Sequence, residues 1–221
     1  MNDITTPLLL SLKVAFWATF FATILGVLSA LALTRVNSIW ADAIDSILTL
    51  PMVLPPTVIG YYLLVLFGRQ GVLGKALSTI GIELVFTWQG AVLAATIVAF
   101  PMVLKSSRAA FEDIDPRLQN AARMLGVSNI AVFIRITLPL ASRGILAGVL
   151  LSFARALGEF GATLMIAGSI PGKTQTISIS IYEAVQAGQD TLANHLVLLT
   201  SITCVLVLWI ARWIKPHYRQ P

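Results

Sequence analysis

Long apolar stretches separated by short charged connections run along the whole chain. Some of these stretches are long enough to cross a hydrocarbon core of about 30 Å, which takes about 20 helical residues. They cover approximately Leu8–Thr34, Ile44–Phe67, Trp88–Leu104, Gly144–Ala167 and Leu196–Ile214. Because a backbone in lipid must satisfy its own hydrogen bonds, these spans should be helical. The pattern predicts an all-α integral membrane protein with about five transmembrane helices, folded as a single domain over residues 1–221.

The second apolar stretch contains three prolines, Pro51, Pro55 and Pro56. Proline lacks a backbone N–H and interrupts the hydrogen-bond ladder of a helix. We therefore expect the first turns of this span to be distorted or unwound. A membrane helix tolerates such a break where the freed backbone faces protein or a water-lined cavity. The prolines are candidate gate residues, with a kink that only shapes packing as the alternative.

Composition agrees with a membrane protein. The chain is 57% hydrophobic and 11% charged, against about 25% charged in soluble domains. Its net charge of +5 comes from basic residues at the predicted membrane edges, so we expect no nucleic-acid partner. The single cysteine, Cys204, lies in an apolar stretch, which excludes an internal disulfide and a cysteine metal cluster.

Lys and Arg are distributed unequally between the two sides of the predicted spans. One side carries Arg35, Lys105, Arg108, Arg117, Arg123, Arg135, Arg143, Arg212, Lys215 and Arg219; the other carries Arg69, Lys75 and Lys173, with Lys13 just inside the first span. Because cytoplasmic loops are enriched in Lys and Arg, we expect the N-terminus outside and the C-terminus in the cytoplasm. The first stretch is too long for the apolar part of a signal peptide, about 7–15 residues, so we expect it to be retained.

The predicted cytoplasmic loop, residues 105–143, contains the signals of a short amphipathic helix. Asp115 suits an N-cap and Pro116 the first helical position, and Gly126 suits the left-handed residue that ends a helix. The residues between them form one apolar stripe with helical period: Leu118, Ala121, Ala122 and Leu125. So short a helix is marginal alone. Its stripe should pack either on the chain's own membrane domain or in a groove of a partner protein.

A second short helix is expected after the first. Ser128 could cap its N-terminus, and the helix would run to Ile136. Pro139 would stop it there, because proline cannot continue the hydrogen-bond ladder.

This loop resembles the signature loop of ABC importer permeases. The family pattern is Glu-Ala-Ala, three residues, Gly, nine residues, Ile, one residue, Leu-Pro. The residues of this chain that correspond to it or flank it, and that the resemblance assigns to coupling, are Asn120, Ala121, Ala122, Leu125, Gly126, Ile136, Leu138 and Pro139. Asn120 departs from the pattern, because the family usually has an acidic residue there. This departure affects any salt bridge at the position and leaves the apolar docking intact.

The resemblance implies a type I ABC importer permease architecture, in which the loop forms a coupling helix in a cleft of a separate ATP-hydrolysing subunit. Three further segments, 50–61, 68–74 and 153–163, resemble the molybdate permease branch, and the last is also similar in sulfate and tungstate permeases. Molybdate is therefore the expected substrate, with tungstate or sulfate as alternatives. The resemblance also implies a bacterial or archaeal cell membrane, an external solute-binding protein and no cofactor. Since five spans enclose little, we expect two copies around a two-fold axis.

Arg155 and Glu159 are ionisable residues within the predicted fourth span. Their i, i+4 spacing lets them meet on one helix face. A charge at the bilayer centre costs about 2.5–3.5 kcal/mol on insertion scales, so pairing or water contact is expected. The pair could simply fix helix packing, line the pathway or join two chains at a gate. We expect it to act in gating or subunit contact rather than in tight binding.

Other classes of function fit less well. An enzyme would need a nucleophile with a base or clustered metal ligands, but His195 and His217 are expected on opposite sides of the membrane and acidic residues do not cluster within the spans. No Gly-x-x-x-x-Gly-Lys-Ser/Thr phosphate loop is present, so ATP hydrolysis is assigned to a partner. A stand-alone carrier or channel remains the main rival, although it would not need a docking loop. Residues 171–194 could hold a short external helix that contacts the binding protein, or merely connect two spans.

Overall fold

The computed structural model describes residues 5–34 and 39–213, apart from the side chains of residues 39, 208 and 210–213. Within these residues the regular elements are all helices, which confirms the predicted all-α class. Several positions named above lie outside the described residues: Arg35, Ile214, Lys215, His217 and Arg219, together with the side chain of Arg212.

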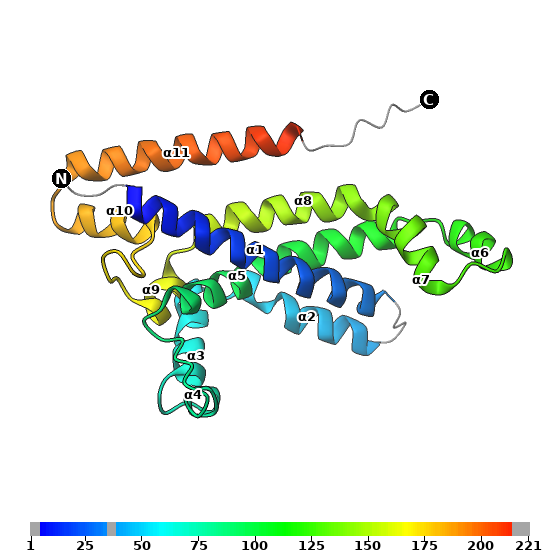
Figure 1. Cartoon of the computed structure of the whole chain (residues 1–221), viewed down its shortest axis with the longest axis horizontal. Coiled ribbons are helices and arrows are strands. Elements are labelled where there is room, and N and C mark those ends of the chain that lie inside the picture. Colours follow the sequence, from blue (N-terminus) through cyan, green and yellow to red (C-terminus); the bar gives the residue numbers. More distant parts are fainter. Residues whose placement is uncertain (1–4, 35–38, 214–221) are drawn as a thin grey trace.

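The helices follow one another through short connections. In chain order they are α1 (Thr5–Leu33), α2 (Ile39–Val53), α3 (Pro56–Phe67), α4 (Val72–Ser78), α5 (Trp88–Glu112), α6 (Pro116–Met124), α7 (Asn129–Val132), α8 (Leu138–Leu157), α9 (Gly161–Ala167), α10 (Ile177–Gln186) and α11 (Asp190–Trp213). Figure 1 shows α1, α2, α5, α8 and α11 running along the longest axis. The short helices α6 and α7 lie at one end, and α9 and α10 lie toward the other.

Four helical segments of the described chain are long and apolar enough to cross a membrane, and the bent pair α2–α3 makes a fifth if it counts as one span. This agrees with the predicted number of about five. The observed bounds differ most from the approximate predicted ones in the third and fourth spans. The third span continues past Leu104 to Glu112, and the fourth runs over Asn129–Leu157 rather than Gly144–Ala167.

The second span is broken in its middle. The predicted position of the break, in the first turns of the span, is therefore wrong. The axes of α2 and α3 differ by 108°, and the break follows Val53, where Pro55 caps α3 and Pro56 starts it. Two consecutive prolines remove two backbone donors, and each also disfavours helix in the residue before it. Pro51 lies inside α2 without ending it.

The second short helix predicted in the cytoplasmic loop does not stop before Pro139. Instead α7 continues through a π-helical segment, Phe133–Thr137, directly into α8. The Leu138 N–H bonds to the Phe133 carbonyl, which is the i→i+5 pattern of a π turn. The prediction was wrong because the wider π turn directly before Pro139 allows the backbone to continue past the proline.

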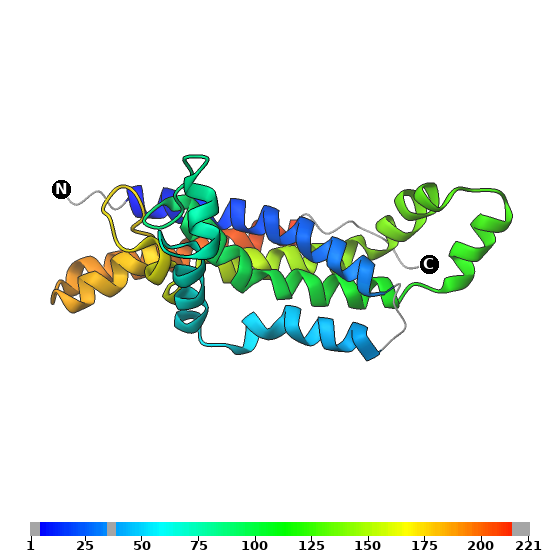
Figure 2. The ribbon, with the colours of Figure 1, turned by 90° about the horizontal axis from the view of Figure 1, so that it is seen from below.

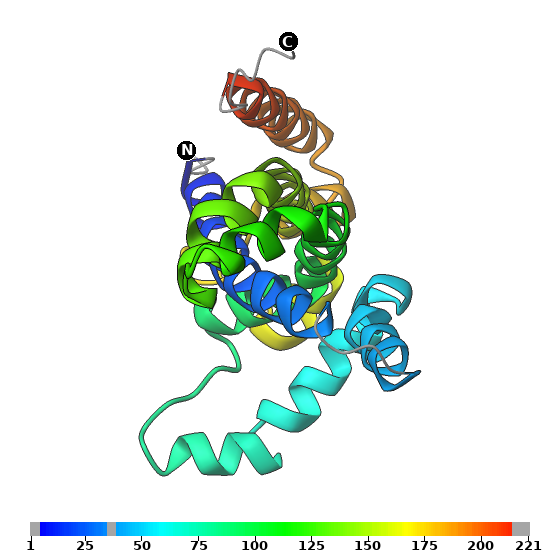
Figure 3. The same cartoon turned by 90° about the vertical axis from the view of Figure 1, so that its right-hand side faces the viewer.

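The core forms around α5, which packs against α1, α8 and α9. The closest contacts use small side chains, and buried alanines of α5 include Ala91, Ala94, Ala95 and Ala99. Figure 2 shows α2 running alongside this bundle at its edge, and Figure 3, viewed along the bundle, shows α11 standing apart from it on the side away from α3 and α4. Small residues allow helix backbones to approach closely in a membrane, where apolar burial alone does not drive association.

The segment 171–194 contains a short helix, α10, which is the first of the two arrangements expected from the sequence. It anchors the start of α11 through a small buried cluster that includes Ile177, Ala184, Ala193 and Leu196. Whether α10 contacts another protein stays a prediction.

Candidate functional site

Helix α6 forms from the local signals predicted for it. The Asp115 carboxylate accepts a hydrogen bond from the Arg117 N–H at 2.8 Å, which satisfies one of the free donors at the helix start. Pro116 occupies the first turn. Gly126 follows the helix with φ +81°, a conformation that glycine adopts without strain, and the Val127 N–H returns to the Ala122 carbonyl. These contacts confirm the predicted bounds of the helix.

Most of the predicted apolar stripe on α6 is exposed. Leu125 is 84% exposed and Leu118 is 50% exposed, while Ala122 is buried against the chain. Met124, which the stripe did not include, is 88% exposed. Within the described part of the chain, the membrane domain therefore covers only a small part of the stripe. We call Leu118, Ala121, Met124 and Leu125 the α6 apolar surface.

Arg123 fixes α6 relative to α7. Its guanidinium donates to the side-chain oxygens of Asn129 and Asn120, each at 3.0 Å. Asn120, which departs from the family pattern, thus accepts from Arg123 as a neutral amide. A cavity of about 510 Å³ lies beneath α6, between it, α7 and the end of α5. Ala122 packs at this inner side of α6.

The remaining predicted coupling residues lie on a different element from the α6 apolar surface. Ile136 belongs to the π-helical segment and is half-buried. Leu138 and Pro139 begin α8, where Leu138 is half-buried and Pro139 is exposed. These three residues therefore lie where the chain returns into the bundle, whereas the α6 apolar surface is exposed.

Arg155 and Glu159 form an ion pair, as predicted, with 2.6 Å between Arg155 Nη1 and Glu159 Oε2. They do not share one helix face, because α8 ends at Leu157 and Glu159 lies in the break before α9. The second carboxylate oxygen accepts from the Ala162 N–H at 2.9 Å. The Glu159 side chain is 1% exposed and that of Arg155 is 29% exposed. Glu159 therefore joins the end of α8 to the start of α9.

The structure brings the two predicted gate candidates together. A Cβ atom placed on Gly161, at the start of α9, would lie 3.2 Å from Cβ of Pro56, at the start of α3. The approach is even closer at Gly60, where a Cβ would lie 2.6 Å from Cβ of Met165 and 2.9 Å from Cα of Ala162. The break in the second span thus packs on the break after α8. Pro56 belongs to this contact, whereas Pro55 caps α3 and Pro51 lies in the last turn of α2.

Sequence reasoning missed a charged cluster between α2 and α5. Asp45 is 8% exposed; it accepts a hydrogen bond from Lys105 and lies 3.1 Å from Arg108 Nη1. Arg108 also donates to Glu112 at 2.7 Å and approaches Asp42 to 3.8 Å. We call these five residues the α2–α5 charge ladder. Lys105 and Arg108 had been assigned only to the membrane edge, although the helical spacing of both sets of charges is visible in the sequence.

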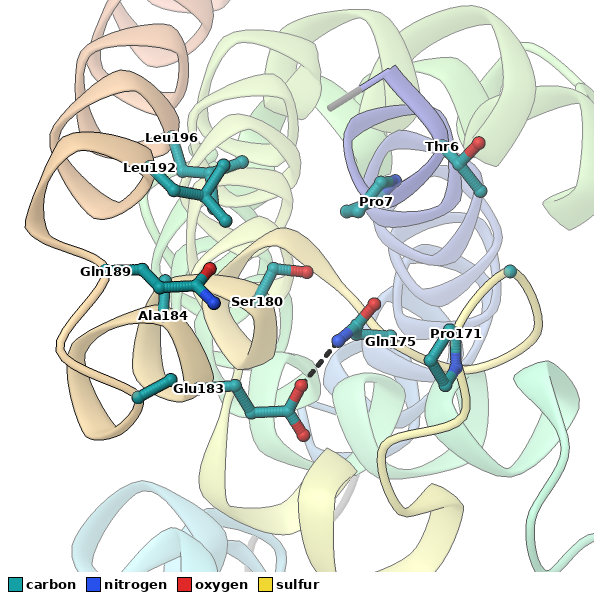
Figure 4. Close-up of a pocket in the computed structure, with 12 residues that line it drawn as sticks. Thr6, Pro7, Pro171, Gln175, Ser180, Glu183, Ala184, Gln189, Leu192 and Leu196 are labelled. Atoms are coloured by element: carbon teal, nitrogen blue, oxygen red, sulfur yellow. Dashed lines mark hydrogen bonds between the residues drawn. The ribbon is translucent and has the colours of Figure 1, made fainter. Parts of the chain in front are cut away.

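A pocket of about 500 Å³ with mixed polar and apolar walls lies at the end of the molecule opposite α6. Its walls come from the start of α1, the 171–175 segment, α10 and the start of α11. Figure 4 shows Gln175 and Glu183 facing each other across it, joined by a hydrogen bond, with Ser180 and Gln189 nearby. Within the described residues, no group of three His, Cys, Asp or Glu side chains is placed to hold a metal.

Comparison with known proteins gives consistent matches. Residues 22–220 match the family described as "Binding-protein-dependent transport system inner membrane component". The chain is 43% identical to the molybdenum transport system permease protein ModB of Escherichia coli K12, over 96% of this chain and 93% of that protein. It is 42% identical to ModB of Haemophilus influenzae, over 96% and 93% of the two chains.

Solved structures share the fold at low identity. The chain is similar to a chain of a bacterial alginate ABC transporter solved in complex with an alginate pentasaccharide-bound periplasmic protein, with a TM-score of 0.77, 19% identity, and coverage of 98% of this chain and 79% of that one. The predicted type I ABC importer permease architecture is thereby confirmed at the level of fold.

Proposed function

Because this chain belongs to the family of binding-protein-dependent transport system inner membrane components, we propose that it is the permease subunit of an ATP-driven importer of molybdate. Family membership makes it a multi-pass inner-membrane transport component and not an enzyme. The observation that carries the choice of substrate is the 43% identity over nearly the full length to a molybdenum transport permease. Tungstate, of the same shape and charge, and sulfate are the competing substrates.

The α6 apolar surface is the proposed docking site for a separate ATPase subunit. Its leucines and Met124 are exposed at the tip of a capped helix, and the described part of the chain leaves them uncovered. An amphipathic helix presented in this way fits a hydrophobic groove of a partner. Arg123 ties the helix to α7 through Asn129, and α6 also packs on the π-helical segment, so a displacement of α6 by the ATPase would act on the start of the fourth span. The absence of an acidic side chain at position 120 leaves the docking to depend on apolar contacts.

The contact between α3 and α9 is the proposed gate region. Both helices begin at a break in a span, and their backbones approach closely at Gly60. Broken spans occur where freed backbone groups face protein or a water-lined pathway. The ion pair of Arg155 and Glu159 lies at this break and would hold one of the two conformations that alternating access needs.

The remaining partners follow from the same function. Two copies would line one pathway around a two-fold axis. An external solute-binding protein would deliver the anion at the end that carries α10 and the pocket beside it, which is opposite α6. With α6 on the cytoplasmic side, the N-terminus lies outside, as the distribution of Lys and Arg predicts. Lipid would surround the exposed apolar faces of α1 and α11.

Reconstitution tests the function directly. The chain, an ATPase subunit encoded beside it and the cognate binding protein would be placed in liposomes with ATP inside and labelled molybdate outside. We expect uptake that requires ATP, the binding protein and the ATPase subunit. Uptake without the ATPase subunit would indicate a secondary carrier or channel instead.

Competition then identifies the anion. Unlabelled tungstate should compete with molybdate, because the two oxyanions match in shape and charge. Sulfate, which is smaller, should compete weakly. If sulfate competes better than molybdate, the assignment to molybdate is wrong, although the importer function stands.

A further inference from the structure

The α2–α5 charge ladder is built around a buried carboxylate. Asp45 is 8% exposed, although Lys105 and Arg108, its two basic partners, remain partly open to solvent. A buried carboxylate is costly unless it is paired and hydrogen-bonded. Breaking such a pair by removing one partner is more costly than never having formed it. The ladder therefore resists separation of α2 from α5.

The charges form rungs between two helices that run in opposite directions. Asp42 and Asp45 are three residues apart on α2, and Lys105 and Arg108 are three residues apart on α5, so each pair spans about one helical turn. Asp45 contacts both bases, and Asp42 lies 3.8 Å from Arg108. Because the spacings match, both acids face these bases together in the observed register. Sliding α2 along α5 would separate the buried Asp45 from at least one of its two bases, so the paired charges oppose sliding.

The ladder lies next to the start of α6. Arg108 also donates to Glu112, the last residue of α5, and only residues 113–115 separate α5 from α6. Asp115, the last of these, caps α6. A displacement of α6 therefore acts on the helical turn that holds the basic rungs.

The other end of α2 leads to the gate region. α2 packs mainly against α5, through the ladder and through Ala41 and Leu48. It ends at the break before Pro55, beyond which α3 packs closely against α9. Figure 2 shows α2 extending from near the end that carries α6 to the level of α3. A movement of α2 along its axis would therefore act on the α3–α9 contact.

We propose that Asp45, Lys105 and Arg108 are positioning residues that make α2 follow α5, so that motion at the docked α6 reaches the α3–α9 gate region. This inference rests on the proposed transport function and adds the route by which ATP hydrolysis moves the gate. The apolar part of the α2–α5 contact alone would hold α2 in place without fixing its register, whereas the paired charges fix the register.

The test compares two acids on the same helix. Asp45→Asn removes the buried charge and keeps the side-chain shape, and Asp42→Asn makes the same change at a side chain that is 79% exposed. In liposomes with the ATPase subunit and binding protein, we expect Asp45→Asn to hydrolyse ATP within about twofold of the wild type. Molybdate uptake per ATP should fall about tenfold, because the loss lies in coupling and not in docking. Asp42→Asn removes only the exposed 3.8 Å contact with Arg108 and should change the ratio less than about twofold. Asp45→Glu should recover most of the loss.

Two measurements keep this result interpretable. Thermal unfolding of each purified variant identifies changes that merely unfold the protein, and Lys105→Gln, which leaves Arg108 on Asp45, provides a milder second variant with the same expected direction. The inference is overturned if both Asp45→Asn and Lys105→Gln keep the wild-type ratio of uptake to hydrolysis, or lose both activities in proportion. If the wild-type complex itself shows no ATP-dependent uptake, it is the proposed function that fails.

Discussion

Glu159 accepts a hydrogen bond from the Ala162 N–H with one carboxylate oxygen and faces Arg155 Nη1 at 2.6 Å with the other. One buried side chain thus serves two helices: it closes the end of α8 electrostatically and satisfies a free donor at the start of α9. Because of this double role, substitutions that remove only the charge and substitutions that also remove the hydrogen-bond acceptor should have different effects.

Neutralising the pair one residue at a time should be asymmetric. Arg155→Gln leaves a buried carboxylate without its cation and should destabilise the protein by about 3 kcal/mol or more. Glu159→Gln keeps an oxygen that can accept from Ala162, so it should cost less. Thermal unfolding of the purified variants measures both. The double variant Arg155→Gln/Glu159→Gln should be more stable than Arg155→Gln alone; equal or lower stability would contradict the pairing.

Reversing both charges should restore transport only in part. Arg155→Glu and Glu159→Arg should each abolish molybdate uptake, and their combination should recover a fraction of it through the exchanged ion pair. Full recovery is not expected, because an arginine at position 159 cannot accept the Ala162 N–H. Uptake in liposomes checks the three variants, and a double variant as inactive as each single one would remove the pairing from the mechanism.

Gly60 should tolerate no side chain. A Cβ at this position would lie 2.9 Å from the α9 backbone at Ala162, so Gly60→Ala must push α3 from α9, at about 1–3 kcal/mol. We expect a lower unfolding temperature and little uptake. Gly158→Ala is the matched control, because its Cβ would make only an ordinary 3.6 Å contact with the Ala154 carbonyl. Comparable losses in both variants would mean that the close approach of α3 and α9 is unimportant.

Gly126 should matter through its backbone alone. Nothing lies within 4 Å of a Cβ placed there, but its φ of +81° is strained for other residues, by about 1–2 kcal/mol. Gly126→Val should therefore reorient the end of α6 and lower uptake per ATP while the spans stay folded. Gly126→Asn should retain most of the coupling, because asparagine tolerates the left-handed region. Normal uptake by Gly126→Val would argue against a coupling role for α6.

Leu125→Asp should release the ATPase subunit. It places a charge in the middle of the α6 apolar surface at a side chain that is 84% exposed, so the isolated chain should keep its stability. Co-purification with the ATPase subunit should be lost. Asn120→Asp is the control, because it introduces the same charge on α6 outside the α6 apolar surface. It makes the contact with Arg123 an exposed ion pair, worth about 0.2–1 kcal/mol, and should leave binding of the ATPase subunit intact. Retention of the ATPase by Leu125→Asp would exclude this surface as the docking site.

The sequence predicted those features that depend on neighbouring residues. Asp115, Pro116 and Gly126 specify the start and end of α6 through contacts within one or two turns. A period of apolar residues likewise suffices to count spans. The sequence placed the break within the second span too early. Proline marks where a helix can be interrupted, but tertiary packing decides which of several prolines ends it.

The features that the sequence did not reveal depend on contacts between distant segments. The i, i+4 spacing of Arg155 and Glu159 predicted their contact correctly. The prediction assumed that the helix continues through Glu159, whereas α8 ends at Leu157. Asp45 lies far in sequence from Lys105, so no local pattern pairs them, even though each helix carries its charges at a regular spacing. The contact of Pro56 with the start of α9 is of the same kind, because it requires two breaks to meet.

The π-helical segment determines which way α8 faces along its whole length. A π turn holds one more residue than an α turn, and one residue corresponds to a rotation of about 100° around a helix axis. Deleting one residue from Phe133–Thr137 would turn the rest of α8 by that amount relative to its neighbours α5 and α1, and would carry Arg155, nearly the full length of the helix away, around the axis with it. The direction in which a charge beside the gate points around the helix axis therefore depends on a turn at the opposite end of the span.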